Sequence, residues 1–361
     1  GVFAVIELST AMPKAGGDYY FIERSMGPLA GTVSGFLSWF ALSMKSAFAI
    51  FGMAAMLHLL LGWNPTLVGI FITLFFVGLN IVGVHEAAKF ETMLVMALLA
   101  IMVAFIAFCI PHMQVARFEP FVPEGASGFT IIATAGIVFV SFGGLLNLSS
   151  VSEEVQNPSR NIPLGMILSI TIVTVIYTLI MIVIAGVSDL KALNDSVTPL
   201  ADVARQYYGN AAFLIICIAA AFAFLTTANA GIMSASRYPL ALGRDKLVPA
   251  GVSRVDPRVE TPPGARIVTG IFIILALQLE LTVLVKAASS VILTSYILSN
   301  LAIIILRESR LRNYRPSFKA PLYPWMQIVS IILFCVLVAM MGLEAIEVSL
   351  GVLLLGLIIF M

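Results

Sequence analysis

Lys45 is a cation near the middle of a long apolar segment, Leu29–Leu61. Helical spacing places small and polar residues on the same face, namely Ser34, Ser38, Ala41, Ala49 and Gly52. Such a stripe packs closely against other helices or borders water, and a cation inside a membrane must be paired or wetted. Lys45 is therefore either a fixed cation or proton carrier, or a structural lysine paired with a carboxylate or with carbonyl groups at a helix break.

The stretch SFGG, residues 141–144, lies near the middle of another apolar segment, Thr130–Ser150. Adjacent glycines weaken a helix, and an interrupted helix exposes backbone groups that bind ligands where they line a cavity. The positive end of a half-helix suits a carboxylate, and free carbonyls suit an ammonium group. The pair thus predicts a zwitterion site. The alternative is that these glycines only allow close helix packing.

The stretch EEVQNPSRNIP follows the glycines toward the end of that segment. Glu153 and Glu154 come about ten residues later, or roughly 15 Å along a helix. Asn157 and Pro158 are expected to break the helix, and Pro163 to open the next one at its permissive first turn. We interpret this region as a cytoplasmic gate or hinge, whose further candidate members are Arg237, Arg244 and Asp245.

Two further apolar segments carry polar stripes, one around Thr226 and Thr227 and one from Ser289 to Asn300. In membrane bundles such residues more often hold helices together than bind ligands. For each stripe taken alone, the lining of a cavity is the alternative.

Membrane spans must position all of these residues. Apolar residues make up 60% of the chain, charged residues only 11%, and the mean hydropathy is +1.05, whereas soluble domains carry about 25% charge. Runs of about 20 apolar residues, enough to cross a hydrocarbon core roughly 30 Å thick, occur along the whole sequence. The chain is predicted to be one all-α, polytopic transmembrane domain over residues 1–361.

We expect about eleven spans. The chain starts without Met inside an apolar run and ends inside another, so the first and last spans are expected to be truncated and at least one upstream span to be missing. The predicted spans are Gly1–Met12, Leu29–Leu61, Thr66–Val84, Phe90–Ile110, Thr130–Ser150, Pro163–Val187, Ala211–Ser236, Gly264–Val283, Leu284–Leu306, Tyr323–Met341 and Ile346–Met361.

Basic residues alternate sharply between successive loops, which predicts orientation because they accumulate on the cytoplasmic side. The Pro13–Pro28 loop is therefore expected to be cytoplasmic. One set of loops has only Arg117, Lys191 and Arg205. The other has Lys14, Arg24, Lys89, Arg160, Arg237, Arg244, Lys246, Arg254, Arg258, Arg266, Arg307, Arg310, Arg312, Arg315 and Lys319.

The remaining polar residues argue against several functions. The net charge is +1 and the basic loops are short, so no nucleic-acid partner is expected. Cys109, Cys217 and Cys335 lie within spans, and the histidines are scattered, so neither a metal site nor a cofactor is predicted. No nucleophile with a base is recognisable inside the spans, so the chain is not expected to be an enzyme.

Three loops carry a resemblance to a known superfamily. ELSTAMPKAGGDYYFIERSMGP contains PKxGGxY, SFGGLLNLSSVSEEVQNPSRNIP contains EExxNPxRxIP, and NAGIMSASRYPLALGRDKLVP contains SRxxxAxxRDxxxP. Together they resemble the amino acid-polyamine-organocation (APC) superfamily of permeases, in order and at suitable spacing. The span pattern agrees over nearly the whole chain.

The resemblance implies the five-plus-five inverted-repeat (LeuT-like) fold with two further C-terminal spans. In that fold the first and sixth helices are broken and hold the substrate. Thr130–Ser150 would be the sixth helix, the segment ending near Met12 the second, and the first would be absent. Phe139 and Phe142 would be hydrophobic lids. The backbone holding the substrate amino group would belong to Ser141, Phe142, Gly143 and Gly144.

Two departures from the family pattern bear on the substrate. The family often has an aromatic gate just before the SF pair and an acid two positions after the second glycine, where this chain has Val140 and Leu146. These residues favour a neutral or apolar amino acid over a cationic one. Some relatives have a lysine in the fifth span at the sodium position, but this chain has none between Phe90 and Ile110, and Lys45 is not a matched position. The resemblance makes Thr226 and Thr227, on what would be the eighth span, the candidates for a sodium site.

The expected function is secondary active transport of amino acids by alternating access in the plasma membrane, as a symporter coupled to H⁺ or Na⁺. The expected partners are the amino acid, the coupling ion and the lipid bilayer. An amino acid exchanger and a non-transporting membrane sensor are the alternatives. A channel would need a repeated filter element or a ring of charges, and the sequence has neither.

Overall fold

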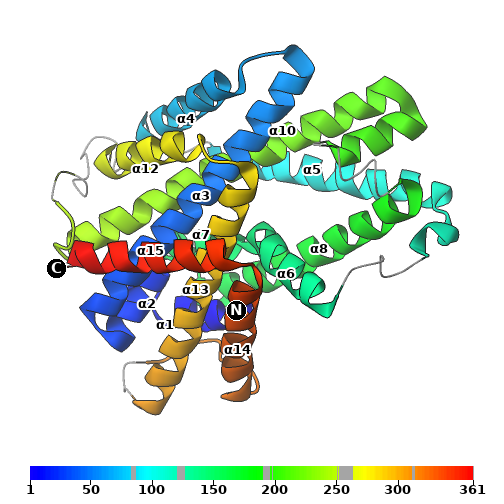
Figure 1. Cartoon of the computed structure of the whole chain (residues 1–361). Coiled ribbons are helices and arrows are strands. Elements are labelled where there is room, and N and C mark those ends of the chain that lie inside the picture. Colours follow the sequence, from blue (N-terminus) through cyan, green and yellow to red (C-terminus); the bar gives the residue numbers. More distant parts are fainter. Residues whose placement is uncertain are drawn as a thin grey trace.

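The computed structural model describes residues 1–82, 87–119, 127–189, 196, 198–249, 251, 263–310 and 314–360, except for the side chains of 82, 87–90 and 359. In these ranges the regular elements are α-helices and short 3₁₀ turns, without strands (Figure 1). The all-α class predicted from hydropathy is confirmed.

The helices follow the predicted spans in order, and one short helix, α2, lies in the predicted cytoplasmic loop. They are α1 (Val2–Ala11), α2 (Asp18–Met26), α3 (Pro28–Leu61), α4 (Pro65–Val82), α5 (Ala87–Cys109), α6 (Gly128–Val138), α7 (Gly144–Ser150), α8 (Pro158–Val187), α10 (Pro199–Arg244), α12 (Pro263–Ala276), α13 (Leu281–Glu308), α14 (Trp325–Met340) and α15 (Leu343–Phe360). The 3₁₀ turns are η1 (Ile110–His112), η2 (Val115–Phe118), η3 (Phe139–Phe142) and η4 (Ser152–Glu154).

Proline opens five of these helices, α3, α4, α8, α10 and α12. Its fixed φ suits the first helical turn, where its missing N–H would have no intrahelical partner in any case. The other end of α3 stops at Gly62, whose φ of 69° is the left-handed conformation that favours glycine. Local sequence thus sets the limits of the longest helical segments.

The predicted start of α8 is wrong. The helix begins at Pro158, so Pro163 lies inside it and does not open it. Proline at that position cannot donate a hydrogen bond to the carbonyl of Ser159, four residues earlier. The Ser317 hydroxyl donates to that carbonyl instead, at 3.3 Å, which shows how a helix can tolerate this proline.

Two other boundaries also differ from prediction. α10 runs well beyond Ala211–Ser236 on both sides and has an internal break at Gly209, where φ is 75°. The predicted boundary between Val283 and Leu284 falls inside α13, because the turn that separates α12 from α13 is the more polar segment 277–280. The end of the predicted span at Val84 lies outside the described residues.

α3 is the central helix of the bundle (Figure 1). It packs against α10, α13, α2, α15, α4 and α12, and the largest cluster of buried apolar residues surrounds it. α14 and α15 meet at an angle of 116°, so that α15 crosses near α3. The predicted last two spans are therefore helices, but they do not form a simple antiparallel pair.

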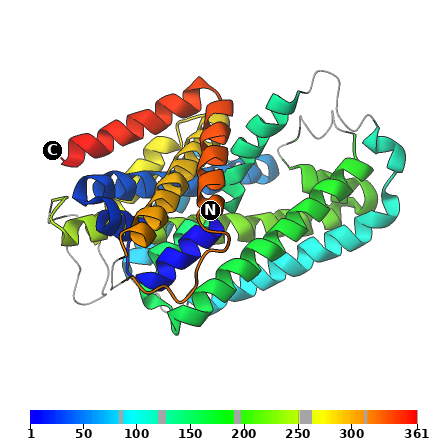
Figure 2. The ribbon, with the colours of Figure 1, turned by 90° about the horizontal axis from the view of Figure 1, so that it is seen from below.

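A second, separate apolar cluster joins α5, α8 and the first part of α10. These three elements extend together to one side of the bundle (Figure 2). Cys109 and Cys217 are buried in this cluster as unpaired thiols, which is consistent with their apolar surroundings.

The outer faces of the helices expose large apolar side chains. Leu67, Phe71, Met96, Phe108 and Met181 are each more than half exposed. A water-soluble protein does not present so much apolar surface, whereas lipid covers it at no cost. Within the described residues, six helices are long and apolar enough to cross a membrane, or seven if α14 and α15 count as one bent span, and three shorter apolar helices accompany them.

The predicted orientation, with the Pro13–Pro28 loop in the cytoplasm, stays a prediction. Five residues used in that argument or placed in its loops, Lys191, Arg254, Arg258, Arg312 and His85, lie outside the described residues, as does the side chain of Lys89.

Candidate functional site

The apolar span at residues 128–150 is interrupted near its middle. α6 ends at Val138, η3 covers the next four residues, and α7 begins at Gly144. The hydroxyl of Ser289 on α13 bridges the interruption, because it donates to the Ile137 carbonyl (2.9 Å) and accepts the Val140 N–H (3.0 Å). A side chain from another helix thus satisfies two backbone groups, as buried backbone in a membrane requires.

The two glycines at this interruption have different surroundings. A Cβ at Gly143 would lie 2.8 Å from Ile292 Cδ1 and 3.2 Å from the Val140 carbonyl oxygen, so a larger residue would require the Ile292 side chain to move. A Cβ at Gly144 would meet no atom within 4 Å, and Gly144 is exposed. Gly143 therefore serves close packing, while Gly144 faces open space at the start of α7.

Lys45 on α3 lies beside the interruption. Its Cδ is 3.8 Å from the Cβ position of Gly143, and its side chain is partly buried. Among the described residues it has no hydrogen-bond or ion-pair partner. Ser34 and Ser38, on the same polar stripe, both donate instead to the carboxylate of Asp18. The structure brings Lys45 and Gly143 together, although their separation in the sequence gave no sign of it.

The two candidate aromatic lids contact different helices. The Phe139 ring lies 5.7 Å from the rings of both Tyr296 and Phe334. The Phe142 ring lies 5.7 Å from that of Tyr177 on α8. Ser141, between them, is exposed. Their assignment as substrate contacts stays a prediction.

The residues that replace the family's aromatic gate and acid are both buried. Val140 is 4% exposed, and Leu146 is completely buried in the main apolar cluster. An ionised carboxylate at the Leu146 position would lose its hydration among apolar neighbours. The packing in this chain thus depends on an apolar side chain at that position.

Thr226 and Thr227 lie on α10 and are partly buried. The Thr226 hydroxyl donates to the Phe222 carbonyl of its own helix at 2.9 Å. Within the described part of the chain, no hydrogen bond links either threonine to Lys45 or to the interruption. The structure does not bring them into the same hydrogen-bonded group, and their role at an ion site stays a prediction.

The two glutamates after α7 form ion pairs with the end of α10. Glu154 pairs with Arg237, and a Glu153 carboxylate oxygen lies 3.7 Å from Arg244 Nη1. The same oxygen of Glu153 accepts the Ala15 N–H at 2.9 Å. The structure therefore brings together all three loops that carry the family resemblance.

The remaining candidate gate residues adjoin these pairs. The Tyr19 hydroxyl donates to the Asp245 carboxylate, which ties α2 to the end of α10. Burial raises the pKa of Tyr19, and this negatively charged partner adds to the effect. Asn157 has the left-handed φ of 48° directly before Pro158, so it makes the turn into α8. Their assignment as a gate or hinge stays a prediction.

Asp18 is a buried carboxylate that sequence reasoning missed. It is 1% exposed and accepts hydrogen bonds from Ser34, Ser38 and Tyr238, the last at 2.6 Å. Burial raises its pKa to about 6, and the hydroxyl donors offset part of that effect. The GGDY sequence gave no sign of burial, because aspartate after two glycines is typical of an exposed turn.

Glu7 is a second buried carboxylate, and its partner is Arg307 rather than Lys45. It is completely buried and accepts from Arg307 Nε (2.8 Å) and Nη2 (2.6 Å). The Tyr314 hydroxyl and the Ala320 N–H also donate to it, both at 2.7 Å. Glu7 is thus fully paired and ties α1 to α13, which leaves Lys45 without it.

A chain of polar side chains that the sequence did not reveal links α4, α10 and α5. The Asn80 amide donates to Asn229 Oδ1 at 2.7 Å, and the Asn229 amide donates to Glu91 Oε1 at 2.5 Å. The Asn80 backbone carbonyl also accepts from Arg266. Asn229 belonged to a predicted polar stripe, and its contacts here are those of helix packing.

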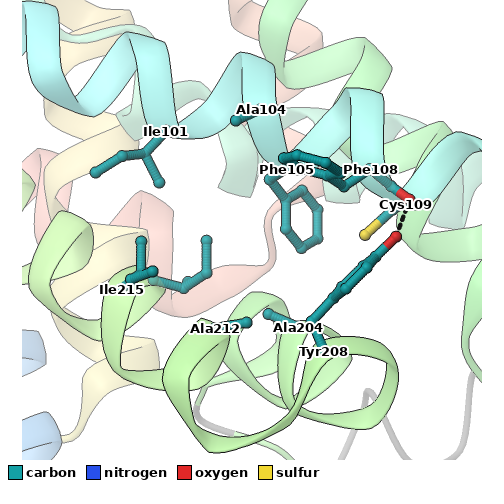
Figure 3. Close-up of a pocket in the computed structure, with 10 residues that line it drawn as sticks. Ile101, Ala104, Phe105, Phe108, Cys109, Ala204, Tyr208, Ala212 and Ile215 are labelled. Atoms are coloured by element: carbon teal, nitrogen blue, oxygen red, sulfur yellow. Dashed lines mark hydrogen bonds between the residues drawn. The ribbon is translucent and has the colours of Figure 1, made fainter.

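A cavity of about 290 Å³ lies between α5 and the first part of α10 (Figure 3). Its walls are almost wholly apolar, and Tyr208 closes one side by donating to the Phe108 carbonyl. None of the predicted site residues lines it. We regard the α6–α7 interruption as the candidate site because it brings together the glycine pair, the ends of two helices and Lys45, which has no ion-pair partner among the described residues.

These features define the class of the protein. An all-helical bundle with apolar outer faces and several long apolar helices is a multi-pass integral membrane protein. The profile of the family described as "Amino acid permease" matches residues 1–360, so the chain belongs to that family. This confirms the superfamily resemblance and identifies the chain as a multi-pass protein of the cell membrane whose curated relatives are named permeases and transporters.

Several curated proteins are similar to this chain. A "Methylthioribose transporter" of Bacillus subtilis is 30% identical over 69% of the chain and 53% of its own length. A "Branched-chain amino acid permease BcaP" of the same organism is 27% identical over 77% of the chain and 59% of its length. The BcaP of Lactococcus lactis is 25% identical over 89% of the chain and 74% of its length. The chain thus spans little more than half the length of the first two relatives.

Proposed function

We propose that this protein is a secondary active transporter of amino acids that works by alternating access. The observation that carries the proposal is the interrupted span, where Lys45 lies beside Gly143 and the adjacent Gly144 faces open space at the start of α7. The positive end of α7 and the carbonyls of the preceding turn are complementary to the charged groups of a zwitterion. The family to which the chain belongs supports the same substrate class.

A neutral or apolar amino acid is the substrate that this chain favours. The completely buried Leu146 leaves no acid at the position where the family often has one. Two relatives named branched-chain amino acid permeases support this choice. The relative named as a methylthioribose transporter makes that sugar a necessary comparison in any substrate panel.

The proposed cycle uses two gates within the five-plus-five inverted-repeat fold. Phe139 and Phe142 close over the substrate at the interruption. The ion pairs of Glu153 and Glu154 with the end of α10 hold the predicted cytoplasmic side closed. Opening that side requires these pairs to separate, and because they are partly exposed, their separation has a small energetic cost.

We further propose symport with H⁺ or Na⁺, with Lys45 as the coupling candidate. Lys45 lies beside the protein backbone that is proposed to hold the substrate, and it has no anionic partner in the described chain. Such a lysine can gain or lose a proton as the substrate binds. Thr226 and Thr227 are the candidates for a sodium site. Exchange without a coupling ion is the alternative, and imposed gradients distinguish the two.

The test measures uptake of a panel of labelled candidate substrates into proteoliposomes that contain the complete protein. The panel includes leucine, isoleucine, valine, arginine and methylthioribose, with proton and sodium gradients imposed in turn. Uptake of branched-chain amino acids above arginine is the expected result. Binding without uptake of any amino acid would overturn the transporter proposal in favour of a sensor.

The site itself is tested by filling the open space at Gly144. Gly144→Leu is expected to reduce uptake more than tenfold while the protein remains folded. Gly165→Leu is the matched control, because Gly165 on α8 is also exposed and has no neighbour within 4 Å of its Cβ position. Equal uptake by both variants would exclude the interruption as the binding site.

Coupling is tested by Lys45→Met. Gradient-driven uptake is expected to fall to the background level while exchange persists. Lys286→Met is the matched control, since Lys286 is paired with Glu344 at 2.8 Å near the start of α13. If gradient-driven uptake by Lys45→Met equals that of the control, Lys45 has no coupling role.

A further inference from the structure

A second pocket lies at the end of α13, on the side that the basic residues predict to be cytoplasmic. Its volume is about 350 Å³, and its lining is half polar and half apolar. The residues around it are Leu306, Arg307, Arg310, Tyr314, Pro316 and Lys319. None of them belongs to the proposed transport site.

The acid beside this pocket, Glu7, already has hydrogen-bond donors for its carboxylate. Glu7 accepts four hydrogen bonds, two of them from Arg307, so that pair is electrically neutral. Glu308, on the neighbouring turn, accepts the Tyr323 hydroxyl at 2.7 Å. In the described residues neither Arg310 nor Lys319 has an ion-pair partner, so the pocket contains two unpaired cations.

The chemistry of the lining selects a particular kind of ligand. Arginine and lysine side chains together favour a phosphate group, which offers several charged acceptor oxygens. Leu306 and Pro316 add apolar surface directly beside those cations. The pocket also lies at the end of α13, a helix long and apolar enough to cross a membrane, and lipid headgroups are expected at the ends of such a helix.

We propose that this pocket binds the phosphate group of an anionic ester at the membrane surface. Arg310 and Lys319 hold the phosphate, and the Glu7–Arg307 pair forms the rigid wall behind it. Both an anionic phospholipid headgroup and a soluble phosphate offer this chemistry. Basic pockets at the cytoplasmic ends of membrane helices suit lipid headgroups in general.

The experiment compares the complete purified protein with a double variant, Arg310→Gln with Lys319→Gln. Thermal unfolding and native mass spectrometry are measured with phosphatidylglycerol, with phosphatidylcholine and with inorganic phosphate. The control variant is Arg24→Gln with Arg160→Gln, which removes two exposed cations on the same predicted side. Lys319→Gln alone serves if the double variant does not elute as a single folded species.

Phosphatidylglycerol is expected to stabilise the wild type and the control variant and to remain bound in the gas phase. The double variant is expected to lose affinity on the order of 30-fold, and the single variant less. Stabilisation by inorganic phosphate as well would identify a soluble phosphate ester as a ligand, and its absence would identify the lipid headgroup. Equal responses of the double variant and the control to every additive would overturn the proposal.

Discussion

Replacing Asp18 by asparagine tests whether this buried carboxylate carries an electrostatic cost. Asp18 is 1% exposed, and its neighbours are hydroxyl donors rather than cations. Burial raises its pKa from 3.8 to about 6. Because each pKa unit corresponds to about 1.4 kcal/mol, ionising Asp18 costs roughly 3 kcal/mol more in the folded protein than in the unfolded chain.

The sign of the pH dependence follows from this difference. The folded protein binds the Asp18 proton more tightly than the unfolded chain does. The contribution of Asp18 to the free energy of unfolding is therefore fully present below pH 3.8 and is lost as the pH rises through about 6. At higher pH no further change from this group is expected. This trend is opposite to that of a carboxylate stabilised by a salt bridge.

The assay is the thermal unfolding midpoint of the purified protein between pH 4.5 and 8. Asp18→Asn should flatten the fall in stability over this range. At neutral pH it should stabilise the protein by roughly 3 kcal/mol, reduced by about 1 kcal/mol because one hydrogen bond is weakened. Glu344→Gln is the control, because the Glu344 side chain is 69% exposed. An unchanged slope in Asp18→Asn, or a greater loss of stability at pH 8 than at pH 4.5, would refute the reasoning.

Two further substitutions test the contacts that hold the interrupted span and the N-terminal helix. Glu7→Gln should lower the free energy of unfolding by roughly 3 kcal/mol, because it leaves Arg307 without a counter-charge, and high salt should not restore it. Ser289→Ala should cost about 2 kcal/mol, measured by denaturant unfolding, since two backbone groups at the interruption lose their partner. Ser290→Ala is its control, because that hydroxyl bonds only within α13, and equal losses in the two serine variants would contradict the bridging role.

The order of the helices could be predicted from the sequence because the residues that define each helix are neighbours in the sequence. A bilayer requires long apolar runs, and prolines at the helix starts mark their beginnings. The exception at the start of α8 has a non-local reason. Pro163 was expected to start α8, but the Ser317 hydroxyl satisfies the carbonyl that it leaves free, and Ser317 is distant in sequence.

The candidate site was predictable only in part for the same reason. Adjacent glycines are visible in the sequence, so the interruption between α6 and α7 was expected. The partner of Glu7 was not predictable, because Arg307 is 300 residues away. The position of Lys45 beside Gly143 likewise arises from packing between α3 and α7 that no local pattern encodes.

The distance between Glu7 and Arg307 has a consequence for biosynthesis. At roughly 5–20 residues per second, a ribosome needs about 15–60 s to make the intervening chain. During that interval α1 is in place with a carboxylate whose eventual counter-charge does not yet exist. The Glu7 carboxylate must therefore stay near water during that interval, and α1 can settle into its final position only when the end of α13 emerges.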